Sequence, residues 1–478
     1  MRAAIVTRVL RLSDVIEATG GRRVGGGAVE LELAGVSTDS RRITSGSLFV
    51  ALKGERFDAH DFLAQAAAHG ARAALVERPL APEKAGPLVQ VVVSDARRAL
   101  GELARAQALR CAARRVAVTG SNGKTTTKEL LRAALSAAGP TVASERSFNN
   151  DVGVPLTLLS IEPATRFAVL ELGSNHPGEI ARLADLARPE IGIVTNCAPA
   201  HVEFLKDLDG VVEEKGALIA ALTESGTAVL NADDPSFPTL RSRARGRVVT
   251  FGVRRPADFR AVEIRFDLRR LVYRVRKQRV YVPLGGCHNV YNSLAALAAA
   301  DVLGVALDEA VASLRRTSPP PMRLFPMHVG GITVIDDSYN ANPGSVEAAF
   351  RTLGAAPIKG RRVVVLGDML ELGSQAAELH ERCGELVSLI PEALVVGVGR
   401  HAADVARGAR SRGADASHVV TCADAAAAAE LLPPLLEPGD TVLVKGSRGM
   451  AMERVVEAIR ARWSGRAAKV AGAGHAGR

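Results

Sequence analysis

Residues 115–127, RVAVTGSNGKTTT, constrain the fold more than any other stretch of the sequence. An apolar run of strand length leads into a turn with two glycines, and the residues that follow, KELLRAAL, are typical of a helix. A strand, a glycine turn and a helix in this order direct backbone N–H groups and a helix N-terminus at one anion. The full phosphate-loop spacing would need a glycine where this chain has Val118. The stretch therefore predicts a nucleotide-binding α/β domain with a variant phosphate loop.

Strand-length apolar runs alternate with helical stretches along the whole chain, in three blocks. Residues 1–110 contain short runs such as SLFVAL and VQVVV and end in a helical stretch. In residues 111–318 the runs FAVLELG, IGIVTN and GTAVLN alternate with helices, which is typical of a parallel sheet covered on both faces. Three prolines at 319–321 predict an extended linker, after which the alternation resumes.

We therefore expect three α/β domains and a tail. Residues 1–110 should form a small α/β domain, residues 111–318 a P-loop-type ATPase domain with a mostly parallel sheet, and residues 319–465 a doubly wound, Rossmann-like domain. Within the second block, residues 257–284 alternate apolar and polar side chains as a half-exposed antiparallel meander does. Residues 466–478 have no pattern and are expected to be disordered.

Composition argues against several classes of protein. No segment approaches about 18 uninterrupted apolar residues and no cleavage pattern is present, so we expect a cytoplasmic chain without a membrane span. The five cysteines are scattered without a C-x-x-C pair, which argues against a disulfide framework and a zinc site. We interpret the net charge of +10 as arginines spread over the whole chain, and with only 4% aromatic residues nucleic acid is not an expected partner.

The phosphate loop and the next apolar run supply candidate ATP and magnesium contacts. Lys124 can neutralise the β and γ phosphates, and the hydroxyl of Thr125 can bind Mg²⁺. Glu171 lies in the run FAVLELG, where a carboxylate enclosed by apolar residues favours a metal ligand over a solvated side chain. A chance G-K-T with a solvated lysine is the alternative, which the preceding strand and the following helix disfavour.

Lys215 lies in a helical stretch, and its position on the helix indicates burial. At about 100° per residue, its direction falls inside the arc of Val212, Leu218, Ile219 and Leu222. A lysine that snorkels to water is the ordinary alternative. A buried lysine instead has a lowered pKa and can, as a neutral amine, capture CO₂ as a carbamate. Such a carbamate would be a metal ligand, and His201 could accompany it on a second Mg²⁺.

Together these residues resemble the Mur ligases of peptidoglycan assembly, over nearly the whole chain. TGSNGKTTT looks like the short phosphate loop of that family, so Val118 is no defect, and Glu171, His201 and Lys215 match its metal-binding residues. GGCHNVYNSLAALAA resembles its G-x-H-N-x-x-N nucleotide segment, although Cys287 replaces the more usual arginine.

Several further motifs resemble one branch of this family, the branch that adds D-alanyl-D-alanine. These motifs are RSFNNDVGVPLTLL, IDDSYNANPGSVEAA, VVVLGDMLELG with His380 downstream, and VLVKGSRGMAMERVV, while VSTDSRRITSGSLFVALKGERFDAHDF resembles the uridine-diphosphate pocket. The resemblance implies an ATP-dependent amide ligase that adds D-alanyl-D-alanine to UDP-N-acetylmuramoyl-tripeptide through an acyl phosphate, releasing ADP and phosphate and completing the cytoplasmic pentapeptide precursor.

The same resemblance implies roles for individual residues. Catalysis falls to Lys124, His201, Lys215 and Arg323. The nucleotide contacts are Gly120, Ser121, Asn122, Gly123, Lys124, Thr125, Thr126, His288, Asn289, Asn292, Arg323 and Asp337. One Mg²⁺ is held by Thr125 and Glu171, and a second by His201 and carbamylated Lys215. The substrate contacts are Ser37, Asp39, Ser40, Arg41, Asn149, Asn150, Lys445, Ser447 and Arg448. Each assignment has a simpler alternative. Arg323 could be a solvated linker charge, and Asp337 a carboxylate in a turn at a strand end. Loop packing could explain 445–448, and a turn with a helix cap could explain 37–41.

Three other functions remain open at this point. A folylpolyglutamate synthase-like ligase would share the phosphate loop and the lysine, but it would lack the 110 residues that precede the loop here. A nucleotide-gated binding protein would not need a second metal site, and a nucleic-acid ATPase would need aromatic platforms.

With three domains, ATP contacts from two of them require closure of the third. A monomer is the default expectation.

Overall fold

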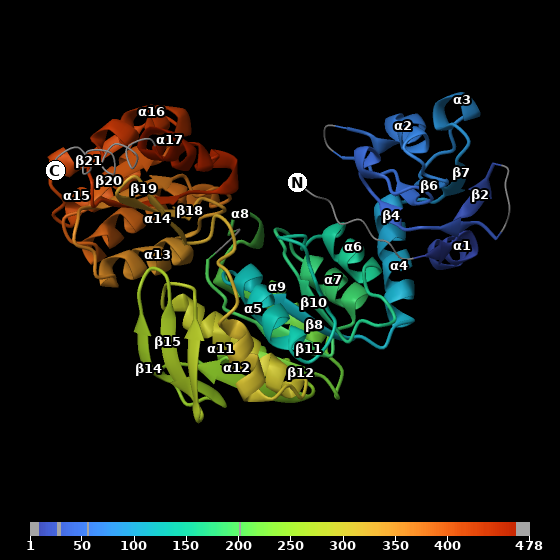
Figure 1. The fold of residues 1–478 in the computed structure, drawn as a ribbon, viewed down its shortest axis with the longest axis horizontal. Helices are drawn as coiled ribbons and strands as arrows, with labels where there is room; N and C mark the ends of the chain where they lie inside the picture. Colours follow the sequence, from blue (N-terminus) through green and yellow to red (C-terminus); the bar gives the residue numbers. More distant parts are fainter. Residues whose placement is uncertain (1–8, 26–29, 55–56, 200–201, 465–478) are drawn as a thin grey trace, which may run out of the picture.

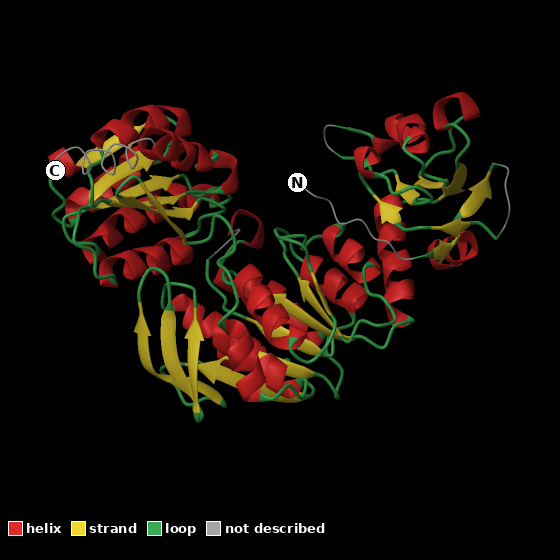
Figure 2. Cartoon of the chain, viewed as in Figure 1, coloured by secondary structure: helices red, strands yellow, loops and turns green. Residues whose placement is uncertain are grey.

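A computed structural model describes residues 9–25, 30–54, 57–199 and 202–464 of this chain. The expected tail, 466–478, and His201 lie outside the described residues. Three sheet-containing units follow one another in a curved row, with the N-terminal and C-terminal units at its two ends (Figure 1). In each unit strands are flanked by helices (Figure 2). The three-part α/β fold expected from the sequence is confirmed.

The N-terminal unit contains a five-stranded sheet in the order β2-β7-β6-β5-β4, parallel except for β2. β1 and β3 form a separate antiparallel pair. The strands are β1 (Leu10–Arg11), β2 (Arg22–Val24), β3 (Glu32–Leu33), β4 (Val36–Ser37), β5 (Leu48–Val50), β6 (Ala73–Val76) and β7 (Val89–Val92). The helices are α1 (Leu12–Thr19), η1 (Ser40–Arg42), η2 (Ala59–Phe62), α2 (Leu63–Ala68), α3 (Pro82–Ala85) and α4 (Ala96–Leu109).

The central unit is built on a nine-stranded sheet in the order β16-β15-β14-β13-β12-β11-β8-β10-β9. Its strands are β8 (Arg114–Thr119), β9 (Thr141–Ala143), β10 (Phe167–Glu171), β11 (Ile191–Val194), β12 (Thr227–Asn231), β13 (Arg247–Gly252), β14 (Phe259–Phe266), β15 (Leu271–Val275) and β16 (Gln278–Val282). Its helices are α5 (Lys124–Ser136), α6 (Gly153–Leu159), α7 (Glu179–Ala187), α8 (Val202–Leu205), α9 (Leu208–Ala220), α10 (Phe237–Ser242), α11 (His288–Val302) and α12 (Leu307–Leu314).

The apolar runs of the central strands are explained by burial on both faces. In β8, Ala117 packs into one core while Val116 and Val118 pack into the core on the opposite face of the sheet. β9 to β13 pair in parallel with their neighbours, whereas β14, β15 and β16 pair antiparallel, as the alternation in residues 257–284 predicts. One face of this meander packs into the second core and the other faces outward.

The third unit has a six-stranded sheet in the order β17-β18-β22-β19-β20-β21, parallel except for β17. Its strands are β17 (Phe325–Val329), β18 (Ile332–Asp337), β19 (Arg362–Gly367), β20 (Leu394–Val398), β21 (Val419–Cys422) and β22 (Thr441–Lys445). Its helices are α13 (Pro343–Ala355), η3 (Gly373–Gln375), α14 (Ala376–Glu385), η4 (Leu386–Leu389), α15 (Ala402–Ser411), η5 (Ala416–His418), α16 (Ala425–Leu435), η6 (Arg448–Met450) and α17 (Glu453–Ser464).

The two junctions between units are built differently. α4 packs against α1 of the N-terminal unit and against α6 and α7 of the central unit, so one core of buried side chains continues through both. The third unit has two cores of its own, against which Leu268 of the β14–β15 turn and Leu324 of the linker pack. All five cysteines are free thiols, and no helix in the described ranges is long and apolar enough to span a bilayer.

Candidate active site

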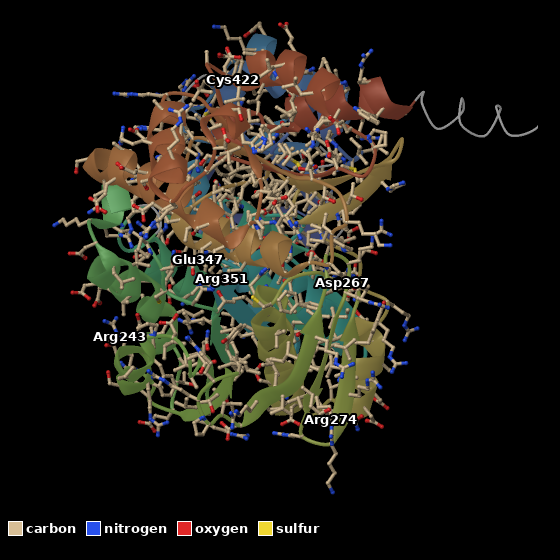
Figure 3. All side chains as sticks on the ribbon, turned by 90° about the vertical axis from the view of Figure 1, so that its left-hand side faces the viewer. Arg243, Asp267, Arg274, Glu347, Arg351 and Cys422 are labelled. Carbon is tan, nitrogen blue, oxygen red and sulfur yellow. The ribbon has the colours of Figure 1, made fainter. Side chains whose placement is uncertain are left out.

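A cavity of about 940 Å³ lies between the central and third units. Its walls are the phosphate loop, the segments after β10 and β11, the start of α11, and parts of the linker, β18 and α13. Figure 3 shows Glu347 and Arg351, two lining residues on α13, at the junction of these units. Ends of parallel strands and a helix N-terminus thus face one space, as in other ligand sites of open α/β sheets.

The phosphate loop follows β8 directly and needs both of its glycines. Gly120 and Gly123 have φ angles of 143° and 83°. A Cβ at Gly120 would overlap the hydroxyl of Thr195, and a Cβ at Gly123 would overlap the side chain of Asn292. Side chains are therefore excluded at both positions by conformation and by space. Val118 lies inside β8, which explains why the loop starts at Gly120.

Groups in the segment that follows β11 hold the phosphate loop in place. The hydroxyl of Ser121 donates to the carbonyl of Ala198 (2.7 Å), and the N–H of Asn122 donates to Oδ1 of Asn196 (3.0 Å). Thr126, in the first turn of α5, is buried and lines the cavity. The loop is therefore held in shape by the protein itself and presents its groups to the cavity.

Lys124 is folded back on the loop. Its ammonium donates to the carbonyls of Gly120 (2.6 Å) and Ser121 (3.2 Å). Burial, and next the nearby cation of Lys215, lower the pKa of Lys124 to about 7. A polyanion in the cavity would stabilise its charged form, because opposite charge raises the pKa of an amine.

Glu171 and Thr125 are hydrogen-bonded to one another at the wall of the cavity. The hydroxyl of Thr125 and the amide of Asn149 both donate to Oε1 of Glu171, each at 3.0 Å. Oε2 of Glu171 is buried and accepts no hydrogen bond from the described residues. Mg²⁺ prefers such oxygen ligands, and this unsatisfied carboxylate oxygen fits a cation at the wall of the cavity.

A residue that the sequence arguments missed lies behind Glu171. Lys128, one turn after Lys124, is fully buried, and its ammonium donates to the carbonyls of Ser144 (2.6 Å) and Arg146 (2.5 Å). It lies 3.7 Å from Oε2 of Glu171. It thus ties α5 to the segment that carries Asn149. Its burial could have been predicted from its position on the apolar face of the helical stretch, by the same reasoning that applies to Lys215.

Lys215 on α9 is buried, as its position on the helix predicts. Its side chain is 1% exposed, its ammonium donates to the hydroxyl of Ser174 at 2.6 Å, and burial lowers its pKa. Ser174 lines the cavity, so the amine lies just behind the cavity wall. Within the described residues no group of three or more His, Cys, Asp and Glu side chains forms a ready metal site.

The start of α11 lines the opposite part of the cavity. His288, Asn289 and Asn292 all border it. The two asparagines are buried and bonded to one another, and Oδ1 of Asn292 accepts from the hydroxyl of Thr127 at 3.3 Å. Nδ1 of His288 is buried without a partner among the described groups, and burial lowers the pKa of His288 to about 4. The histidine is therefore neutral at pH 7, and this ring nitrogen has no hydrogen-bond partner in the described structure.

Three residues of the third unit complete the cavity. Arg323 in the linker stacks over the ring of Tyr339 at 4.2 Å, and its guanidinium donates to the hydroxyl of Ser147 at 3.4 Å. Asp337 accepts from the N–H of Leu324 (3.0 Å) and forms an ion pair with Lys445 (2.7 Å). Both partners of this pair line the cavity, although the sequence arguments assigned them separately to nucleotide and substrate.

Two further residues of the third unit, Ser447 and Arg448, do not line the cavity. The hydroxyl of Ser447 accepts from the N–H of Leu370 at 2.9 Å, and Arg448 pairs with Glu453 at 2.8 Å. Loop packing, the alternative considered for them, accounts for these contacts.

Ser37, Asp39, Ser40 and Arg41 lie together in the N-terminal unit at the end of β4 and in η1. Asp39 caps η1 and pairs with Arg41 at 2.8 Å, while the hydroxyl of Ser40 donates to Gln65. These contacts belong to a capped turn and also leave the guanidinium of Arg41 exposed. The four residues are outside the cavity, whereas Asn149 and Asn150 line it.

One contact joins the phosphate loop directly to the third unit. Nδ2 of Asn342, the residue that caps α13, donates to Oδ1 of Asn122 at 2.9 Å. Asn342 belongs to the motif IDDSYNANPGSVEAA, which by itself indicates no role for this residue. Nothing in the local pattern indicates which distant loop it contacts.

Fold and site define a nucleotide-binding α/β protein in which a second α/β unit forms one wall of the cavity at the phosphate loop. Models of the Mur ligase family match three successive segments: its catalytic domain at 32–108, its middle domain at 118–300 and its glutamate ligase domain at 322–448. The chain belongs to the Mur ligase family, and it is an ATP-dependent ligase that forms an amide bond.

Named relatives and solved structures are similar over almost the whole chain. UDP-N-acetylmuramoyl-tripeptide–D-alanyl-D-alanine ligase from Escherichia coli K12 is 42% identical, covering 90% of this chain and 94% of the relative. The crystal structure of MurF from Acinetobacter baumannii superposes with a TM-score of 0.88 at 32% identity, covering 96% and 100%. The structure of MurF ligase from Thermotoga maritima in complex with ADP superposes with a TM-score of 0.78 at 27% sequence identity, covering 90% of this chain and 98% of that chain.

Proposed function

We propose that this chain joins D-alanyl-D-alanine to UDP-N-acetylmuramoyl-tripeptide at the expense of ATP, completing the pentapeptide precursor of peptidoglycan. The observation that carries the proposal is the cavity in which the phosphate loop, Glu171, Arg323 and Lys445 face one another. The name of the 42% identical Escherichia coli relative supports the choice of substrates. This degree of likeness favours the dipeptide ligase over a folylpolyglutamate synthase-like enzyme.

The proposed reaction has two steps. A carboxylate is a poor electrophile, so the terminal carboxylate oxygen of the tripeptide first attacks the γ-phosphorus of ATP, and ADP leaves. The amine of the dipeptide then attacks the resulting acyl phosphate, and inorganic phosphate leaves as the amide forms. Both steps bring anions together, so fixed cations should contribute most to the rate.

The cations and dipoles around the cavity suit the first step. Lys124 and the loop N–H groups would hold the β and γ phosphates, and Arg323 would neutralise the γ-phosphate from the other side. Thr125 and Glu171 would hold Mg²⁺, which when bound supplies further positive charge to the phosphate oxygens. His288, Asn289 and Asn292 would contact the adenosine, and Asp337 would orient Lys445 toward the ligand.

We further propose that Lys215 carries a CO₂-derived carbamate that serves, with His201, a second Mg²⁺. Burial lowers the pKa of Lys215, and its amine donates to the neutral hydroxyl of Ser174 rather than to a carboxylate, so an uncharged form is readily accessible. A carbamate would convert this buried cation into an oxygen ligand at the cavity wall.

The other substrate contacts are proposed from both ends of the cavity. Asn149, Asn150 and Lys445 would contact the tripeptide portion, because all three line the cavity. Ser37, Asp39, Ser40 and Arg41 would bind the uridine diphosphate on the N-terminal unit. We propose 1–110, 111–318 and 319–465 as the three functional domains of a cytoplasmic monomer, with closure of the third completing the ATP site.

Phosphate release tests the function directly. It is measured with ATP, UDP-N-acetylmuramoyl-tripeptide and D-alanyl-D-alanine, each omitted in turn. Release should require all three, and Lys124→Met should lower kcat/KM by roughly 100-fold or more. Lys84→Met, an exposed lysine on α3, is the matched control and should be silent. Full release without the dipeptide would refute the ligase assignment.

The carbamate has its own test. Protein equilibrated with ¹³C-enriched CO₂ should show a carbamate resonance that is absent from Lys215→Ala. That variant should be inactive and partly rescued by a small added carboxylate. Wild-type activity in Lys215→Ala would remove the residue from the mechanism.

A further inference from the structure

The antiparallel meander β14–β16 has one face whose side chains are exposed or half-buried. Side chains directly opposite one another in the register share a face. The inner face contains Ala261, Val275 and Val280, which are buried. The outer face is defined by the register pairs Val262–Arg274, Arg265–Val272, Arg274–Arg279 and Val272–Tyr281. Arginines are thus interleaved with valines and one tyrosine on a pleated surface.

This small sheet carries most of the excess positive charge of the protein. Residues 259–282 contain eight arginines and lysines against two acidic residues, a balance of +6 in a chain of net charge +10. All eight basic side chains are exposed. The expectation that the excess charge is spread over the whole chain is therefore wrong, because eight basic residues fall within this one continuous stretch of the sequence.

The arrangement of the arginines is unfavourable for the fold itself. Arg274 is directly opposite Arg279, and like charges in such a pair destabilise a sheet. Arg274 pairs with Glu263 at 2.9 Å, but in the described structure Arg265, Lys277 and Arg279 have no acidic partner. Val262, next to them, is 45% exposed. A ligand that neutralises these charges would explain their position.

The outer face is separate from the catalytic cavity. None of the meander residues lines that cavity. In Figure 3 Arg274 lies at the lower end of the meander, and Asp267 lies at its other end near the third unit. β14 and β15 lie at the margin of the molecule in Figure 1. A broad partner could therefore contact the meander without obstructing the cavity.

We propose that the outer face of β14–β16 docks the protein on an anionic phospholipid bilayer. Arginine forms paired hydrogen bonds with phosphate, and each basic side chain near such a surface adds electrostatic attraction. Val262, Val272 and Tyr281 suit the interfacial region between headgroups and acyl chains. A single-stranded nucleic acid would need several aromatic platforms, and Tyr281 is the one aromatic residue in the register pairs of this face.

Vesicle co-sedimentation of the full chain tests the proposal. The protein should bind vesicles of phosphatidylcholine with phosphatidylglycerol at about 0.05 M salt and be released at about 0.5 M. It should not bind pure phosphatidylcholine. Arg279→Glu should weaken binding roughly tenfold. The same variant should melt at an unchanged or higher temperature, because a carboxylate at this position would face Arg274, and its phosphate release should be unchanged.

A matched variant separates this face from net charge alone. Arg454→Glu reverses an exposed arginine on α17, and it should leave vesicle binding unchanged. Equal losses in both variants, no binding by the wild type, or equal binding to neutral vesicles would overturn the proposal. Tighter binding to a single-stranded oligonucleotide than to the anionic vesicles would also overturn it. None of these results depends on ligase activity.

Discussion

Gly123 allows a quantitative test of how the phosphate loop is built, because Gly178 offers a control with the same backbone. Gly123 precedes α5 with φ 83° and ψ −6°, and Gly178 precedes α7 with φ 86° and ψ −7°. Alanine in this left-handed conformation costs about 1–2 kcal/mol at either position. A Cβ at Gly178 would meet nothing within 4 Å, whereas one at Gly123 would overlap Oδ1 of Asn292.

The difference between the two variants follows from what Asn292 holds. To make room it must move, and it then loses the bonds to Thr127 (3.3 Å) and Asn289 (2.9 Å). These groups are buried, and each bond broken in such a place costs about 1–3 kcal/mol. We therefore expect Gly178→Ala to lose about 1 kcal/mol of stability, and Gly123→Ala to lose about 4 kcal/mol.

Denaturant unfolding of both variants, with ATP binding measured in parallel, checks these values. Adding Asn292→Ala to Gly123→Ala should cost less than it does in the wild-type background, because the alanine leaves space for the new Cβ. Equal destabilisation by the two glycine substitutions would refute the reasoning, as would strict additivity of Gly123→Ala and Asn292→Ala.

Three further predictions concern buried charges. The pKa of Lys124 is about 7 in the free protein, and bound phosphates raise it, so ATP binding above pH 7 should take up a proton. Calorimetry in buffers of different ionisation enthalpy measures this uptake, which should be absent from Lys124→Met. The pKa of His288 is about 4 when folded against 6.5 unfolded, so stability should fall as pH drops from 6.5 to 4. Thermal melts should show a shallower fall for His288→Asn. Lys128→Met removes the donor from two buried carbonyls and should cost about 3 kcal/mol in denaturant unfolding, against none for Lys84→Met.

The parts of the fold that sequence reasoning predicts are those that depend on local periodicity. Runs such as RVAVT are buried on both faces, and the helical position of Lys215 requires burial, so both could be inferred from spacing alone. The phosphate loop is equally local, because its two glycines and Lys124 lie within five consecutive residues. Burial of Glu171 likewise follows from its apolar neighbours.

What could not be predicted depends on contacts between distant segments. The bond from Asn342 to Asn122 and the ion pair of Asp337 with Lys445 join residues more than 100 positions apart. No periodicity records which loops face one another across a cavity. The edge strand β17 also lacks a local signal, because Pro326 interrupts its apolar run, and an edge strand tolerates a proline that a central strand would not.

The packing of α4 has a mechanical consequence. Because one apolar core runs from α1 through α4 into α6 and α7, separating the first two units would expose buried side chains to water. The third unit has complete cores of its own and is joined through the proline linker and a few contacts such as Asn342 with Asn122. We therefore expect the first two units to move as one rigid body, and any opening of the molecule to occur between this body and the third unit, where it breaks few buried contacts.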